Sequence, residues 1–219
     1  AIQPDEQQIL SRLVPENRVV LVGHAEDCRS SPCTSSDLCF VGSRYVVNED
    51  SLLHFVRDAW PAIRASCPET KLQVAGGVSQ SPGVVAAAQQ DDRIVLRGIV
   101  PQVKDIYAGP AVMICPMAVG SGLKIKMVEA LAHGKAVVGT PIAAQGLAAG
   151  VNSAFQVAER PADFVGPIIR LLRNPQEREH WEQAALRFAR EHLAEEPVWR
   201  EMKARLDQWR SRPRVRRAA

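Results

Sequence analysis

The chain has 219 residues, which leaves room for one large domain or two small ones. Hydrophobic residues make up 46% and charged residues 23%, as is ordinary for a soluble globular protein with a substantial core. The net charge of +3 does not by itself indicate an acidic partner, and we expect no nucleic-acid binding. We see neither a signal peptide nor an apolar run that could cross a bilayer, so we expect a cytoplasmic protein. Because the sequence starts at Ala1 without a methionine, we expect a fragment of a longer chain.

The five cysteines are an odd number, which does not suit a framework of paired disulfides. Cys28, Cys33 and Cys39 are spaced too irregularly for a paired zinc-ligand pattern, and Cys115 lies in a predicted core strand. We therefore expect reduced thiols and no metal site. The role of the first three cysteines stays open.

The first part of the chain predicts little regular structure. A short helix over residues 2–13 and a strand over 18–22 precede a polar segment, 24–37, that has no periodicity and is typical of a linker. The compact part begins at Leu38.

From Leu38 onward, predicted strands and helices alternate. Strands are expected at 38–41, 71–75, 94–96, 111–115, 136–138 and 154–157. Helices are expected from Asn48 or Ser51 to Ser66 with a bend at Pro61, and at 82–90, 103–108, 123–133, 161–172, 175–192 and 196–209. This alternation predicts an α/β fold: a doubly wound, mostly parallel, Rossmann-like sheet with helices on both faces, plus C-terminal helices.

Glycines follow four of these strands, in Gly42-Ser43-Arg44, Gly76-Gly77, Gly98-Ile99-Val100 and Gly120-Ser121-Gly122. In doubly wound sheets, ligands bind beyond the carboxyl ends of the strands. Four glycine-bearing exits would gather on that edge. The sequence therefore predicts a ligand site there.

The stretch from Ala111 to Thr140 predicts a strand, a glycine loop, a helix capped at Gly134 and a second strand. The amides at the start of such a helix bind anions. Lys124 and Lys126 lie near this positive helix end, which is unfavourable unless an anion is expected there. The alternative is a solvated helix face with one pair between Lys126 and Glu129.

The predicted C-terminal helix carries apolar residues near helical spacing, which we interpret as core packing: Trp199, Met202, Leu206 and Trp209. The end of the chain, Arg210 to Arg217, has five arginines in eight residues. Such a run is typical of a solvated, disordered tail, and the alternative is contact with an anionic membrane surface.

Several segments in this order carry a resemblance to a known family: FVGSRYVVNEDSLLHFV, KLQVAGG, RIVLRGIVPQVKDIYAGPAVMICP and GSGLKIKMVEALAHGKAVVGT. Over about Leu38 to Leu193 the chain resembles the C-terminal, donor-binding domain of a GT-B-fold retaining glycosyltransferase of glycosyltransferase group 1. The resemblance implies a nucleotide-sugar-binding domain over 37–195. Residues 1–36 would be the linker and the end of an acceptor domain preceding Ala1, and 196–219 would be a C-terminal helix and basic tail.

The resemblance also implies roles for single residues. Glu129 matches the glutamate that accepts hydrogen bonds from two ribose hydroxyls, and Gly120 to Ile125 match the loop that contacts the distal phosphate and the sugar. Arg44 and Lys126 resemble basic residues near the diphosphate, and Val100 the strand exit that meets the base. The implied substrate-binding residues are Gly42, Ser43, Arg44, Val100, Gly120, Ser121, Gly122, Leu123, Lys124, Ile125, Lys126 and Glu129.

Two departures from the family pattern affect this assignment. Ser121, separated from Glu129 by seven residues, stands where a first glutamate is frequent, so sugar contact there is in doubt. A second basic residue usually follows shortly after Arg44, but Val46, Val47 and Asn48 stand there instead.

The implied reaction is transfer of a sugar from a nucleoside diphosphate to an acceptor hydroxyl with retained configuration. Helix-start amides, Arg44 and Lys126 would stabilise the departing diphosphate, without a metal or another cofactor. A catalytic base cannot be assigned, since catalytic groups would lie partly in the acceptor domain. The alternatives are a GT-B-fold sugar-nucleotide epimerase and a non-catalytic nucleotide-sugar-binding module. The implied location is the cytoplasm, with peripheral contact to the inner membrane face as an alternative.

Overall fold

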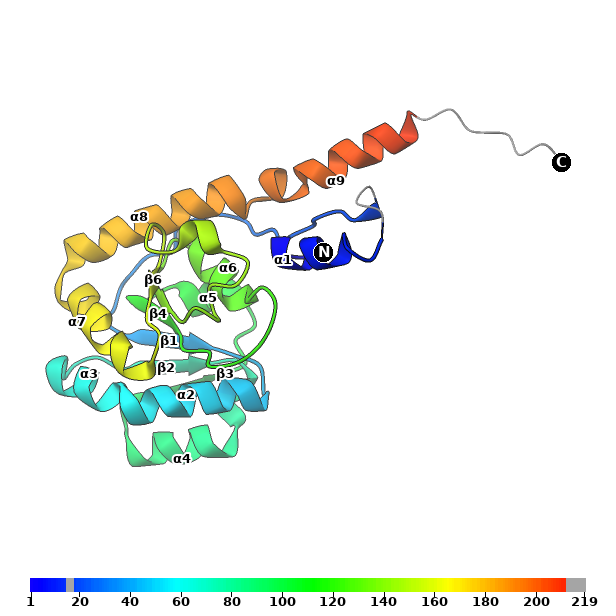
Figure 1. Cartoon of the computed structure of the whole chain (residues 1–219). Coiled ribbons are helices and arrows are strands. Elements are labelled where there is room, and N and C mark those ends of the chain that lie inside the picture. Colours follow the sequence, from blue (N-terminus) through cyan, green and yellow to red (C-terminus); the bar gives the residue numbers. More distant parts are fainter. Residues whose placement is uncertain (15–17, 212–219) are drawn as a thin grey trace.

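The computed structural model describes residues 1–14 and 18–211. Its centre is a six-stranded sheet in the order β3-β2-β1-β4-β5-β6, and every neighbouring pair is parallel (Figure 1). The predicted doubly wound α/β fold is therefore confirmed. The strands are β1 Leu38–Val41, β2 Leu72–Ala75, β3 Ile94–Gly98, β4 Val112–Cys115, β5 Ala136–Gly139 and β6 Gln156–Val157.

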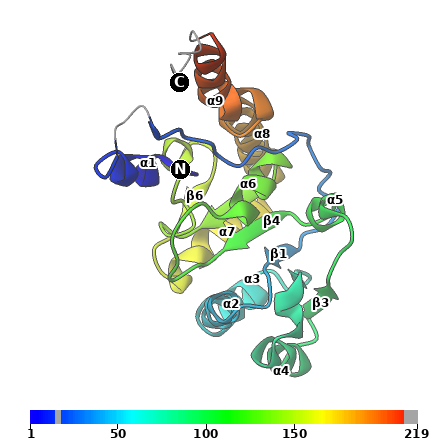
Figure 2. The same ribbon diagram turned by 90° about the vertical axis from the view of Figure 1, so that its right-hand side faces the viewer.

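Helices cover both faces of this sheet. On one side α2 contacts α3 and α4, and α3 contacts α7; on the other side α6 contacts α8 (Figures 1 and 2). Strands β4 and β5 are buried along their whole length, which explains why their sequences lack polar alternation. The helices are α1 Pro4–Leu10, α2 Val46–Asp58, α3 Trp60–Ser66, α4 Pro82–Gln90, α5 Val103–Tyr107, α6 Ile125–Ala132, α7 Val165–Arg173, α8 Pro175–His192 and α9 Glu195–Arg210.

The strand predicted over residues 18–22 is wrong. Among the described residues this stretch belongs to no strand; the Ala1 ammonium donates to the Val20 carbonyl, and the Ala1 carbonyl accepts from the Val22 amide. The polar segment 24–37, called the linker below, is fixed to the domain by two backbone hydrogen bonds. The Glu26 amide donates to the Leu193 carbonyl at the end of α8, and the Arg29 amide donates to the Ala132 carbonyl at the end of α6. An apolar run without a partner strand cannot form a ladder.

Two predicted helix starts are corrected. Helix α2 begins after Tyr45, earlier than either predicted cap, because the Asn48 side chain donates to the Ser43 carbonyl at 3.1 Å instead of capping the helix. The helix then breaks at Ala59, and α3 restarts with Pro61 in its first turn, where proline is tolerated. Helix α6 begins two residues later than predicted, after Lys124.

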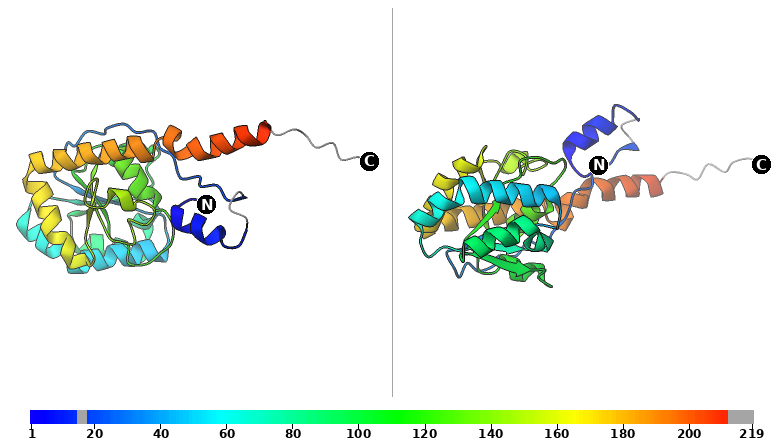
Figure 3. Two further views of the ribbon diagram at one scale, coloured as in Figure 1. Left: turned by 45° about the horizontal axis from the view of Figure 1, so that its top comes forward. Right: turned by 90° about the horizontal axis from the view of Figure 1, so that it is seen from below.

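The interpretation of the C-terminal helix as core packing is also wrong. No residue of α9 is buried, and Leu206 and Trp209 are 44% and 71% exposed. The reason is that α9 runs away from the sheet beyond the end of α8 (Figure 3). Most of the arginine-rich stretch, residues 212–217, lies outside the described residues, so membrane contact stays a prediction. None of the helices in the described ranges is long and apolar enough to span a bilayer.

The sheet order places β1 beside β4, so the chain leaves these two strands toward opposite faces of the sheet. The loop after β2 packs closely against the loop after β1 at the carboxyl edge of the sheet. Gly76 has φ +86° and ψ −173°, and a Cβ atom there would lie 2.4 Å from the Gly42 carbonyl oxygen. Only glycine lets the β1 and β2 exits approach this closely.

We expect Gly76→Ala to lower the free energy of unfolding by about 3 kcal/mol, through backbone strain together with the clash against Gly42. Gly98→Ala is the matched control, because Gly98 also has a positive φ of +68° but nothing lies within 4 Å of an added Cβ. That control should lose only about 1 kcal/mol. Urea unfolding of both variants tests this, and equal losses would show that the close approach contributes nothing.

Candidate functional site

A pocket of about 420 Å³ opens at the carboxyl edge of the sheet, between the exits of β1 and β4. Its position is the switch point at which ligands bind in this class of sheet. Seven of the predicted residues line it: Gly42, Ser43, Leu123, Lys124, Ile125, Lys126 and Glu129. The structure therefore brings residues from the β1 exit and from the start of α6 to one site.

The other predicted residues lie outside the lining. Arg44 is exposed beside the pocket, and a Cβ at Gly77 would lie 2.8 Å from its backbone nitrogen. Val100 packs against the core after β3. Gly120, Ser121 and Gly122 form the loop before α6, next to the lining residues. Their proposed contacts with a ligand stay predictions.

Lys124 connects the glycine loop to the helix. It occupies the N-cap position of α6, and its ammonium group donates to the Gly122 carbonyl at 2.7 Å and the Ser121 carbonyl at 3.2 Å. Partial burial lowers the pKa of this lysine. The ammonium group therefore holds the loop shape at the mouth of the pocket.

Lys126 lies deeper. Its ammonium group donates to Asn48 Oδ1 at 2.7 Å and sits 4.5 Å from the centroid of the Phe40 ring. Within residues 1–14 and 18–211 it makes no ion pair with Glu129, so the alternative of a solvated lysine–glutamate pair is wrong. Burial lowers its pKa, and the neighbouring Lys124 charge adds to that effect.

Glu129 is half-buried on the next turn of α6. The Tyr107 hydroxyl donates to its Oε2 at 2.8 Å. Burial raises the pKa of Glu129, while the Tyr107 hydrogen bond opposes that rise; Glu26 and His24 of the linker add effects of opposite sign. The carboxylate is thus held in a desolvated place where it can accept hydrogen bonds.

The start of α6 completes the site. The first turn contains no acidic residue, and Lys124 supplies no side-chain cap. Lys124 and Lys126 lie at the N-terminal, positive end of this helix, which is unfavourable in the absence of an anion. Free helix-start amides, two cations and a carboxylate acceptor form a site suited to a ligand with both an anionic group and hydroxyl groups.

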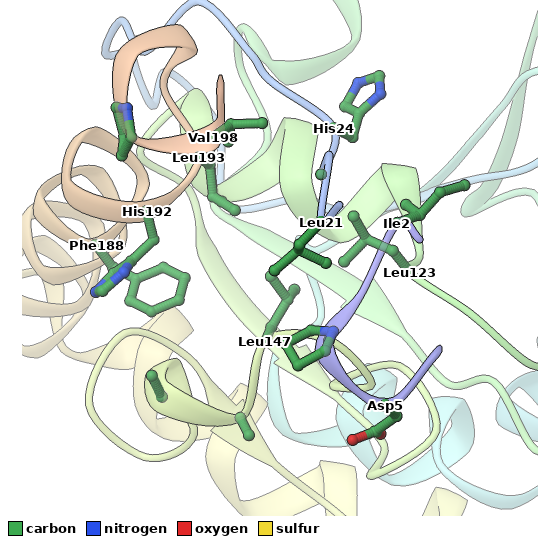
Figure 4. Close-up of a pocket in the computed structure, with 16 residues that line it drawn as sticks. Ile2, Asp5, Leu21, His24, Leu123, Leu147, Phe188, His192, Leu193 and Val198 are labelled. Atoms are coloured by element: carbon green, nitrogen blue, oxygen red, sulfur yellow. The ribbon is translucent and has the colours of Figure 1, made fainter. Parts of the chain in front are cut away.

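A second pocket of about 370 Å³ lies on the other side of Leu123, where the N-terminal segment meets the end of α8 and the start of α9. Figure 4 shows Leu147, Phe188 and Leu193 around this cavity. Its lining contains no lysine or arginine. The second pocket therefore lacks the cations of the first pocket. We take the first pocket as the candidate functional site.

Some site residues were missed by the sequence analysis. Gly76 and Gly77 were recognised as a strand exit but not as pocket lining, and Asn48 was interpreted only as a helix cap. Met117 and Tyr107 gave no signal, since both belong to runs that resemble ordinary core. The residues that the structure describes contain no cluster of three or more metal-ligating side chains, and all five cysteines are free thiols.

The sequence profile of the family described as glycosyl transferases group 1 matches residues 35–174. The chain belongs to this family. The predicted resemblance is therefore confirmed, although no curated protein sequence matches the chain.

Solved structures agree on the fold of this group 1 family member. TarM from S. aureus, in complex with fondaparinux, alpha-GlcNAc-glycerol and UDP, superimposes with a TM-score of 0.77 at 12% identity, over 94% of this chain and 43% of TarM. Anabaena HepE with UDP and glucose gives 0.74 at 12% identity, over 97% and 62% of the two chains. The C-terminal domain of LpcC from Francisella tularensis, a group 1 family protein, gives 0.61 at 12% identity, over 76% and 89%.

The chain thus spans less than two thirds of the length of TarM and of HepE. The TM-scores show a common GT-B fold, but sequence identities of 12% say nothing about the substrate of this chain. Among the three, only the isolated LpcC domain is covered over more than two thirds of its own length.

The lowered pKa of Lys126 leads to a prediction about stability. Because the folded-state pKa lies below the unfolded value, the unfolded chain binds more protons between the two values, and stability rises with pH in that window. Lys126→Met removes this gain. We expect the variant to be more stable relative to the wild-type protein at pH 7 than at pH 10, as measured by urea unfolding. A difference that does not change with pH would contradict a desolvated ammonium group.

Proposed function

We propose that this chain is the donor-binding half of a glycosyltransferase, which moves a sugar from a nucleoside diphosphate to an acceptor hydroxyl with retained configuration. The observation that carries the proposal is the gathering of Lys124, Lys126 and Glu129 around one pocket at the switch point of the sheet. The family membership supports the reaction class. Residues 37–195 are the proposed nucleotide-sugar-binding domain.

In this proposal the diphosphate lies at the start of α6. Its negative charges face the helix-start amides and the two lysine ammonium groups. The ribose lies against Glu129, because a carboxylate can accept hydrogen bonds from both hydroxyls of a vicinal diol. The base lies toward the exit of β3 at Val100, the glycine-bearing exit beyond that of β2 along the edge.

The demanding step is departure of the diphosphate. As the bond from the anomeric carbon to the phosphate oxygen breaks, negative charge develops on the diphosphate. In this proposal Lys126, which lines the pocket, and the helix-start amides stabilise that charge, with assistance from Arg44, the residue after the lining residue Ser43. The acceptor hydroxyl and its base belong to a separate acceptor domain in this proposal.

UDP is the first nucleotide to test, since it is present in the TarM and HepE complexes. UDP-, GDP- and ADP-linked sugars compared by thermal shift would identify the donor. The alternatives predict other outcomes in the full-length protein: an epimerase converts the sugar without an acceptor, and a binding module binds without turnover.

We expect residues 1–219 alone to bind UDP, GDP or ADP but to transfer no sugar, because only the donor half of a two-domain cleft is present. Calorimetry measures the binding, and chromatography of sugar-nucleotide reactions with candidate acceptors measures transfer. Transfer by this chain alone would contradict the proposed division of labour.

Glu129→Ala should weaken nucleoside-diphosphate binding by about ten- to hundred-fold, because it removes charge-assisted hydrogen bonds to the ribose. The fold should persist, since the side chain lines a pocket rather than the core. Glu191→Ala, on the exposed side of α8, is the matched control and should bind as the wild-type protein does. If calorimetry gives unchanged affinity for Glu129→Ala, this residue does not hold the ribose.

A further inference from the structure

Tyr107 contacts the Glu129 carboxylate but does not itself line the pocket. It ends α5, its side chain is fully buried, and its hydroxyl donates to Glu129 Oε2 at 2.8 Å. The same hydroxyl lies 3.5 Å from the Lys126 carbonyl oxygen. A buried hydroxyl has one proton to donate, and here that proton goes to the carboxylate.

The Tyr107 ring is itself fixed by a contact that starts in the linker. It stacks on His133, with ring centroids 4.8 Å apart and planes at 14°. His133 Nδ1 lies 2.8 Å from Ser31 Oγ, and the Ser31 amide donates to the His133 carbonyl at 2.9 Å. The linker thus holds the histidine, the histidine holds the tyrosine ring, and the tyrosine hydroxyl holds Glu129.

We propose that Tyr107 is a positioning residue, which fixes the Glu129 carboxylate in the orientation that binds both ribose hydroxyls, and that Ser31 and His133 hold Tyr107 in place. This inference rests on the proposed function of the pocket. It adds a residue that does not line the pocket and to which the sequence analysis gave no role.

The physical need for such a residue comes from the glutamate side chain. Its last torsion is broad, so an unrestrained carboxylate rotates freely and loses entropy when it binds a diol. The Tyr107 hydrogen bond occupies one lone pair of Oε2. Oε1 and the second lone pair of Oε2 stay available for the two hydroxyls.

The hydrogen bond also favours the ionised form of Glu129. Four groups act on this carboxylate besides burial: Tyr107 of α5, Lys126 of α6, and His24 and Glu26 of the linker. Tyr107 lowers the pKa of Glu129 against the effect of burial. Its removal should therefore let the carboxylate take up a proton at higher pH than in the wild-type protein.

The test compares Tyr107→Phe with the wild-type protein against two ligands, the tightest-binding of UDP, GDP and ADP and its 2′,3′-dideoxy counterpart. We expect about ten-fold weaker binding of the ribose form, and less than about two-fold change for the dideoxy form. As the pH falls from neutrality, the variant should lose its remaining ribose-dependent affinity at higher pH. A merely structural role would weaken both ligands alike and would move no pH profile.

Tyr45→Phe is the matched control, because Tyr45 is 61% exposed at the start of α2 and is the other tyrosine of the chain. It should bind both ligands as the wild-type protein does. Ser31→Ala should weaken the ribose form selectively but less than Tyr107→Phe, since it only loosens the histidine. If Tyr107→Phe does not fold, Ser31→Ala becomes the test of the proposal. Equal affinities of Ser31→Ala and the wild-type protein for the ribose form then overturn it.

The outcomes for the wild-type protein separate this inference from the proposed function. If it binds none of UDP, GDP and ADP, the proposed function fails. If it binds one with clear preference for the ribose form, and Tyr107→Phe keeps that preference at every pH, the function stands and the role of Tyr107 is overturned.

Discussion

The candidate site depends on one half-buried ammonium group. Lys126 joins three elements that are far apart in the sequence, because it belongs to α6, donates to Asn48 of α2 and packs over Phe40 of β1. These elements meet only because β1 and β4 are neighbours in the sheet. The same neighbour relation creates the opening beyond the strands. The lysine therefore lies where the topology leaves space for a ligand.

The linker has a greater part in the site than its polar composition suggests. Backbone hydrogen bonds fix it along the ends of α6 and α8, and Ser31 reaches His133 at the C-cap of α6. His24 and Glu26 lie close enough to influence the charge of Glu129. A segment without helix or strand thus contributes to the surroundings of the Glu129 carboxylate, and a shift of that segment would change the electrostatic environment of Glu129.

The order of the elements could be predicted from the sequence, since buried strands such as β4 are apolar throughout and α4 and α8 are delimited by proline and polar residues. Contacts between elements could not. Asn48 is a good helix cap by residue type, but its partner Lys126, 78 positions away, is available only once the starts of α2 and α6 come together. The apolar face of α9 was predicted to pack in the core but is not buried. Helical spacing shows that one face of a helix is apolar, but it does not show which element covers that face.

Burial acts on the three charged residues of the pocket in the same sense. It lowers the pKa of Lys124 and Lys126 and raises that of Glu129, so that each ionised form is disfavoured in the folded protein. The two ammonium groups donate to backbone carbonyls and to a side-chain amide oxygen, and the carboxylate accepts from a tyrosine hydroxyl. Within the described ranges none of these three charges forms an ion pair with another. Mutual ion pairs would have been the simplest way to stabilise them. Keeping cations and carboxylate apart leaves both available to a single ligand that carries phosphate charge at one end and hydroxyl groups at the other.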